Sequence, residues 1–167
     1  MRRQRNSFSD FVQDTVSGAV GGLVGTAALW LADSAMQKWA PSTTAPMRVE
    51  PGPYMVHQGH RMLPARTWGM IPDKAEKTAA ASLSFCYGMT FGAIYGALRP
   101  RGGSALLDGA ILGTICWAVG YLGWLPAAGI MPPVWRQKPG QVAGPIAQHA
   151  LYGVAAVGAY DLIKSHV

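Results

Sequence analysis

Between Lys77 and Arg99 the sequence reads TAAASLSFCYGMTFGAIYGAL, a run of 21 residues from Thr78 to Leu98 that carries no charge. A helix rises about 1.5 Å per residue, so a run of this length is long enough to cross a bilayer core of about 30 Å. Three further runs are uncharged: residues 15–32, 109–135 and 139–160, with 18, 27 and 22 residues. Together the four runs predict an all-α, polytopic membrane protein with a four-transmembrane-helix bundle.

The composition agrees with a membrane domain. Only 13% of the 167 residues are charged, whereas soluble domains carry about 25%. The 21 glycines would be costly in soluble helices, but membrane helices use glycine to bring their backbones close together. A chain of this length corresponds to a single domain, residues 1–167.

Prolines and glycines set the expected helix bounds. Pro126, Gly129 and the pair Pro132-Pro133 end the helix of the third run, and Gly140 with Pro145 places the start of the fourth helix near residue 141. We therefore expect helices at about 15–36, 78–98, 105–127 and 142–163. A polar, proline-rich link at about 37–76 joins the first two and holds no segment of membrane length.

The net charge of +6 is spread over the flanks of the apolar runs. A nucleic-acid partner would require a basic stripe or patch, so we expect no nucleic acid and name membrane lipids as partners. The basic residues before Phe8 are followed by Asp10 and Asp14 and by no convincing cleavage site, which argues against a removed signal. The short basic turn Arg99-Pro100-Arg101 favours an orientation of this multi-pass membrane protein with both termini in the cytoplasm.

Glycines recur at a spacing of four, which places them on one face of a helix. These helix-packing candidates form a glycine-zipper pattern: Gly18, Gly22, Gly88, Gly92, Gly96, Gly109 and Gly113. Small residues let helices associate by close van der Waals contact, because lipid tails are as apolar as leucine. The faces serve either internal packing or the docking of another membrane-protein subunit or a second copy of the chain.

Tryptophan favours the membrane interface, where its ring is in an apolar region and its N–H meets a polar one. Four tryptophans fall near the two links at one membrane face and are the expected interface anchors: Trp39, Trp68, Trp124 and Trp135.

His149 is the single histidine inside an uncharged run and the main chemical candidate. A metal site with Cys86 and Cys116, or a pigment or haem ligand, lacks supporting spacing, so we expect no metal and no cofactor. The interpretation we favour is a neutral, structural His149 that hydrogen-bonds across helices. His57-Gln58-Gly59-His60 could pair on a helix, but its glycine and the nearby prolines argue against one.

Acidic residues offer no catalytic pattern. Asp33, Asp108 and Asp161 are expected at helix ends, which leaves no acid at mid-membrane for a proton relay. The sequence holds no Ser-His-Asp order, phosphate-binding loop or dinucleotide fingerprint. We therefore do not expect an enzyme and name no catalytic residue.

The second half of the chain carries a family pattern: Gly109-Ala-Ile-Leu-Gly113, Trp117, Leu125-Pro126, Gly129, Pro132-Pro133-Val-Trp135 and His149-Ala-Leu-Tyr152-Gly153. Over about residues 80–165 it resembles the YagU-like bacterial inner-membrane proteins, a family of poorly defined function. The resemblance implies a location and a fold, a link to acid tolerance, and no established catalytic residues.

Two functional hypotheses follow. The first is a non-catalytic accessory or scaffold subunit of a larger inner-membrane complex, suggested by the many glycine faces and the long link. The alternative is a small transporter or channel-like protein in acid or ion homeostasis, for which only His149 and a few Ser and Thr side chains offer a polar path.

Overall fold

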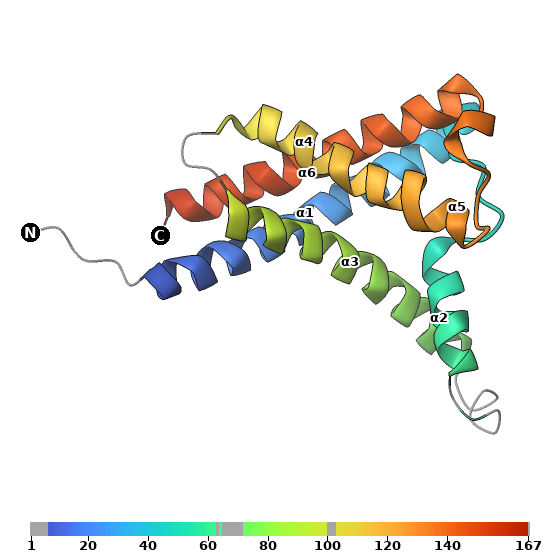
Figure 1. The fold of residues 1–167 in the computed structure, drawn as a ribbon, viewed down its shortest axis with the longest axis horizontal. Helices are drawn as coiled ribbons and strands as arrows, with labels where there is room; N and C mark the ends of the chain where they lie inside the picture. Colours follow the sequence, from blue (N-terminus) through green and yellow to red (C-terminus); the bar gives the residue numbers. More distant parts are fainter. Residues whose placement is uncertain (1–6, 63, 65–71, 100–102, 167) are drawn as a thin grey trace, which may run out of the picture.

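The computed structural model describes residues 7–62, 64, 72–99 and 103–166. These residues form an all-α fold without a strand among them (Figure 1). The long elements are α1 (Ser7–Trp39), α3 (Asp73–Leu98), α4 (Ala105–Trp117) and α6 (Pro139–Ser165). The shorter ones are η1 (Pro41–Thr43), α2 (Pro51–Arg61), the π-helical η3 (Ala118–Trp124), α5 (Leu125–Ala127) and η4 (Val134–Arg136).

The first helix is longer than the uncharged run that predicted it. It begins eight residues earlier and continues to Trp39, because neither flank contains a glycine or proline that would stop it; Pro41 follows its end. Asp10 lies in its first turn, where a carboxylate meets the positive end of the helix dipole. Asp14 and Asp33 are consequently inside the helix, and the prediction that Asp33 lies at a helix end is wrong.

The link between α1 and α3 contains a helix, contrary to the prediction for His57 and His60. Pro51 and Pro53 lie in the first turn of α2, where a missing N–H has no intrahelical partner to lose. Gly52 packs against Ala80 of α3, since a Cβ on Gly52 would lie 2.9 Å from the Ala80 carbonyl oxygen. This packing outweighs the cost of about 1 kcal/mol that Gly59 imposes inside a helix.

The third segment runs from Ala105 to Ala127 but changes its winding on the way. From Ala118 to Trp124 it is π-helical, and Gly123 departs from helical geometry with φ −99° and ψ −106°. Gly129 then adopts φ 73°, a left-handed conformation that glycine takes without steric cost and that turns the chain out of α5. The Pro132-Pro133 loop and η4 lead into α6.

α6 begins at Pro139, earlier than the predicted start near residue 141. Lys138 is its N-cap, and the Gln141 side chain accepts the Lys138 backbone N–H at 3.1 Å, which satisfies a donor at the helix start. Pro145 is therefore inside the helix and not in its first turn.

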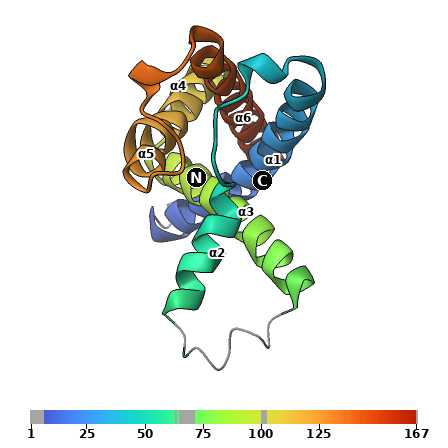
Figure 2. The same ribbon diagram turned by 90° about the vertical axis from the view of Figure 1, so that its right-hand side faces the viewer.

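The long helices pack side by side in the order α3, α1, α6, α4, each antiparallel to its neighbour (Figure 2). α3 and α4 approach each other mainly through side chains: Tyr87, Phe91 and Tyr95 of α3 pack against the buried cluster that α4 and α6 form. The chain ends at 7 and 166 lie at one end of this array, and α2, α5 and the two short 3-10 helices lie at the other (Figure 1).

Among the described residues, two helices are long and apolar enough to cross a membrane by length and composition: Phe8–Trp39 and Ala105–Ala127. α3 and α6 are also long, but polar residues such as Gln148 and His149 in α6 make them less apolar.

Candidate functional site

The contact between α1 and α3 is made of glycines from both helices. A Cβ on Gly92 would lie 2.8 Å from the Cα of Gly22 and closer still to the carbonyl oxygen of Gly18. Gly88 faces the backbone of Gly22 and the side chain of Thr26, whose hydroxyl lies directly against the Gly88 Cα. The two helices therefore touch through backbone atoms at Gly92 and through one small side chain at Gly88. Gly96 continues this face, and a Cβ there would meet the Asp14 carbonyl group. The structure thus brings together all five predicted glycines of these helices.

α1 carries a second glycine face, one position further round, which contacts α6. A Cβ on Gly25 would lie 2.6 Å from the carbonyl oxygen of Tyr152, and one on Gly21 would meet that of Ala156. α1 is therefore the central element, with close backbone contacts on two sides.

The third glycine contact joins α4 and α6. A Cβ on Gly109 would lie 2.6 Å from the Cα of Val154, and one on Gly113 would meet the carbonyl group of His149. The α6 side supplies Gly153, which meets the Gly109 carbonyl group. Gly153 was not among the predicted packing residues, because the residues four positions away on either side, His149 and Val157, are not small.

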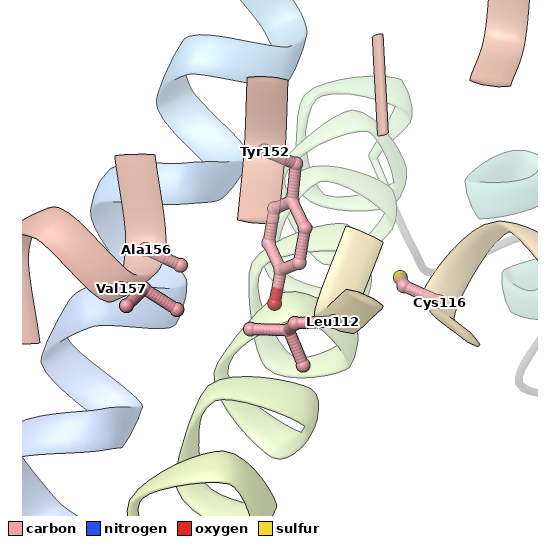
Figure 3. Close-up of a cluster of buried hydrophobic side chains, with 5 residues drawn as sticks. All are labelled: Leu112, Cys116, Tyr152, Ala156 and Val157. Carbon is pink, nitrogen blue, oxygen red and sulfur yellow. The ribbon is translucent and has the colours of Figure 1, made fainter. Parts of the chain in front are cut away.

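Tyr152 fills the space where α1, α3, α4 and α6 approach one another. Its side chain is 1% exposed, and its hydroxyl donates a hydrogen bond of 2.6 Å to the carbonyl oxygen of Gly88. Figure 3 shows the ring beside Leu112, in the buried cluster Leu112, Cys116, Tyr152, Ala156 and Val157. The bond links α6 to α3, whose backbones are not in close contact.

His149 is buried, but its hydrogen bond stays within α6. Its Nδ1 lies 2.8 Å from the carbonyl oxygen of Pro145. Because a carbonyl only accepts, Nδ1 carries the proton in this geometry. The predicted hydrogen bond across helices is replaced by a ring contact: the Tyr121 ring meets the imidazole edge-on at 5.4 Å between centroids, and Trp117 stacks on Tyr121 at 6.0 Å.

Asp33 contributes a polar contact between α1 and α6. One carboxylate oxygen accepts from Gln148 Nε2 at 3.2 Å and the other from Gln37 Nε2 at 2.6 Å. Gln148 is buried, and its amide requires a partner at that depth.

Charged and aromatic side chains tie the helices together at the end where the chain termini lie. Arg99 forms an ion pair with Asp161, and its guanidinium lies 4.9 Å from the centre of the Tyr160 ring. Lys164 pairs with Asp14 at 2.8 Å. Burial lowers the pKa of Arg99, but the hydrogen bond to Asp161 and neighbouring negative groups raise it above its ordinary value, so Arg99 is charged.

Asp108 also belongs to this end, in the first turn of α4, where it accepts a hydrogen bond of 3.2 Å from the Tyr95 hydroxyl. Tyr95 and Tyr160 meet edge-on at 5.6 Å between centroids. The network therefore joins all four long helices.

The predicted tryptophan anchors fall into three groups. Trp39 and Trp135 are 76% and 79% exposed at the end opposite the termini. Trp124 is half-buried against the cluster of Trp117, Tyr121, Leu125, Ile130 and Met131. Trp68 lies outside the described residues.

The two cysteines do not form a site with His149. Cys86 is exposed on α3, whereas Cys116 is buried on α4. Within the described ranges, no three His, Cys, Asp or Glu residues lie close enough to hold a metal ion.

Comparison of the chain with protein-family models, curated proteins and solved structures finds no match. The resemblance to the YagU-like family therefore stays a prediction from the sequence.

Proposed function

We propose that this chain is an integral protein of the bacterial inner membrane, that its four long helices span the bilayer, and that it serves as a non-catalytic accessory or scaffold subunit of a larger membrane complex. The observation that carries the membrane part of this proposal is that α1 and α4 each expose a row of large apolar side chains on the side away from their glycine contacts.

On α1 the outward face consists of valines spaced four residues apart, Val12, Val16, Val20 and Val24. Val16 is 57% exposed, whereas its neighbour Ser17 is 5% exposed and Thr26, on the inward face, is 3% exposed. In water this arrangement would leave apolar area hydrated along the length of a helix. In lipid the same valines meet acyl chains, and the buried hydroxyls bond to the backbone, as Thr26 does to Gly22 at 2.8 Å.

α4 repeats the arrangement. Leu107, Ile111 and Ile115 are each at least half exposed, at 61%, 51% and 50%, while Gly109 and Gly113 are buried. Two helices from different halves of the chain therefore present apolar stripes of the kind that a bilayer covers.

The lengths of α3 and α6 support spanning by these helices as well. Their uncharged runs of 21 and 22 residues cover about 32 and 33 Å at 1.5 Å per residue, close to the bilayer core of about 30 Å. Both helices pack against α1, the more apolar one, so a bilayer that contains α1 surrounds them too.

The scaffold role is supported by how the interior uses its polar groups. Tyr152 bonds to Gly88 and Asp33 to Gln148, and each of these bonds joins two helices. His149 bonds within α6 and contacts the Tyr121 ring of the neighbouring segment. The glycine faces support docking of another subunit less than the sequence suggested, because the structure uses these faces for contacts between helices of the same chain.

Purification of the tagged chain from native membranes in a mild detergent tests the role. A stoichiometric large complex supports the scaffold subunit. A small homo-oligomer without other subunits contradicts it and favours the alternative, a small transporter or channel-like protein in acid or ion homeostasis.

The proposed orientation has both termini in the cytoplasm. Met62, which is 88% exposed after α2, and the exposed Ser165 near the C-terminus mark the two faces. In intact cells, an impermeant thiol reagent applied from the periplasm should label Met62→Cys and leave Ser165→Cys unlabelled; the reverse pattern refutes the orientation.

A further inference from the structure

The described cations at the two ends of the helix array differ in whether they form ion pairs. At the end with the termini, the described cations are neutralised within the chain: Arg99 pairs with Asp161, and Lys164 with Asp14. Their charges are used to join helices.

At the opposite end, the described cations are exposed and none of them forms an ion pair with another described residue. We call this surface the basic end and define it by Lys38, Arg48, Arg61, Lys74, Lys77, Arg136 and Lys138. Among the described carboxylates nearby, Glu76 pairs with His60 at 3.2 Å, and Asp33 accepts hydrogen bonds from two glutamine amides. Glu50, the exposed N-cap of α2, forms no ion pair with a described cation. Seven exposed cations on one surface give it a positive potential, which attracts anions from outside the chain.

α2 holds part of this surface in a fixed position. It runs across the end of the array and not along its long axis (Figures 1 and 2). Gly52 fixes it against Ala80, and Tyr54 packs into the cluster around Trp117 and Tyr121. If the long helices cross a bilayer, α2 consequently lies along the membrane plane, with Met55 and Met62 exposed.

The aromatic residues at the same end indicate the depth of this surface. Trp39 and Trp135 are exposed there, beside Lys38 and Arg136 in the sequence. Tryptophan beside a cation is typical of the headgroup level of a bilayer, where the ring meets the upper acyl chains and the cation meets phosphate.

We propose that the basic end binds the headgroups of anionic phospholipids. This inference rests on the membrane location proposed above. Phosphate oxygens on lipids with a net negative charge supply the missing counter-charges, and the exposed tryptophan and methionine side chains enter the acyl region beside them. A zwitterionic lipid offers no net charge to the seven cations and binds there less well.

Electron spin resonance of spin-labelled lipids tests this with the full chain reconstituted in phosphatidylcholine bilayers. The motionally restricted fraction measures lipid at the protein surface. We expect spin-labelled phosphatidylglycerol to be preferred over spin-labelled phosphatidylcholine by about fivefold, the factor that one cation contributes at an anionic surface. The preference should collapse in 1 M salt, where the Debye length is about 3 Å.

Two matched variants assign the effect to the basic end. Replacing Arg48, Arg61, Lys74 and Lys77 together by Gln should reduce the preference to near unity. Exchanging Arg for Lys and Lys for Arg at the same four positions keeps the charge and should keep the preference.

The outcomes separate the two proposals. If neither lipid shows a restricted fraction, the chain does not span the bilayer and the proposed function fails. If both lipids are restricted equally, or if the Gln variant keeps the preference, the helices span but the basic end has no role in lipid selection. A preference that appears only for an added acidic peptide would replace the lipid by a protein partner and overturn the inference.

Discussion

Gly92→Ala adds one methyl group at a close backbone contact between α1 and α3. The new Cβ would lie 2.8 Å from both the Cα and the backbone nitrogen of Gly22, and closer to the Gly18 carbonyl oxygen. All three atoms belong to the backbone of α1, so no flexible side chain can move aside. The helices must separate instead.

The size of the effect follows from this distance. Non-bonded carbon atoms lie about 3.6 Å apart, so the Cα of Gly22 alone requires the helices to separate by at least about 0.8 Å. This is enough to lose a quarter to a half of the dispersion attraction across the affected contact. Overpacking of this kind costs about 1–3 kcal/mol, and better helix propensity returns up to about 1 kcal/mol. We expect Gly92→Ala to lower the free energy of unfolding by about 1–2 kcal/mol, and Gly92→Leu to lower it further.

Reversible unfolding in mixed micelles, with a rising fraction of a denaturing detergent and helix content followed by circular dichroism, measures this loss. Gly158→Ala is the matched control, because a Cβ there meets nothing within 4 Å. It should leave stability unchanged or raise it slightly. Equal stability of the Gly92 and Gly158 variants would refute the close contact between α1 and α3.

Three further predictions use the same unfolding assay. Tyr152→Phe removes the hydrogen bond to Gly88 and should cost about 1 kcal/mol, with no loss if the hydroxyl bond is absent. His149→Asn keeps a side-chain donor and should preserve stability and copurification with partners, whereas His149→Leu should lower the free energy of unfolding by about 1 kcal/mol. An Asn variant that assembles normally but loses function would show that His149 has a chemical and not a structural role. Arg99→Asp should destabilise the chain, and adding Asp161→Arg should restore part of the loss; no rescue in the double variant would argue against this ion pair.

The positions of the long helices could be predicted from the sequence, because the central part of each one lies within a long uncharged run. The sequence did not predict their ends. The flanks around Asp14 and Gln37 are polar but contain no glycine or proline, so α1 continues through them beyond the uncharged run. α2 was missed for a related reason. Its prolines are harmless in a first turn, and contacts of Gly52 and Tyr54 with distant residues stabilise it.

The glycine spacing indicated faces but not pairs. Gly88 and Gly92 share a face with Gly96 on any helix, yet the same pattern occurs on α1 and α4, so the sequence cannot say which faces meet. Contacts between single residues that are far apart in the chain also leave no recognisable pattern in the sequence around them. Gln148 and Asp33 are 115 residues apart, and Tyr152 and Gly88 are 64 apart. The valines of α1 recur at a spacing of four, on a different face from its glycines, and from this pattern the exposed apolar side of α1 could have been predicted.

The central claim is that the valine face of α1 lies in lipid, and a spin label at Val20 tests it most directly. In a Cys86→Ala background the buried Cys116 is shielded from the reagent, so Val20→Cys carries the label, and Ser165→Cys provides an aqueous reference. In reconstituted bilayers the Val20 label should collide often with oxygen, which concentrates in lipid, and rarely with a water-soluble nickel chelate. Nickel accessibility at Val20 equal to that at Ser165 would mean that this face lies in water, and would contradict a membrane-spanning α1.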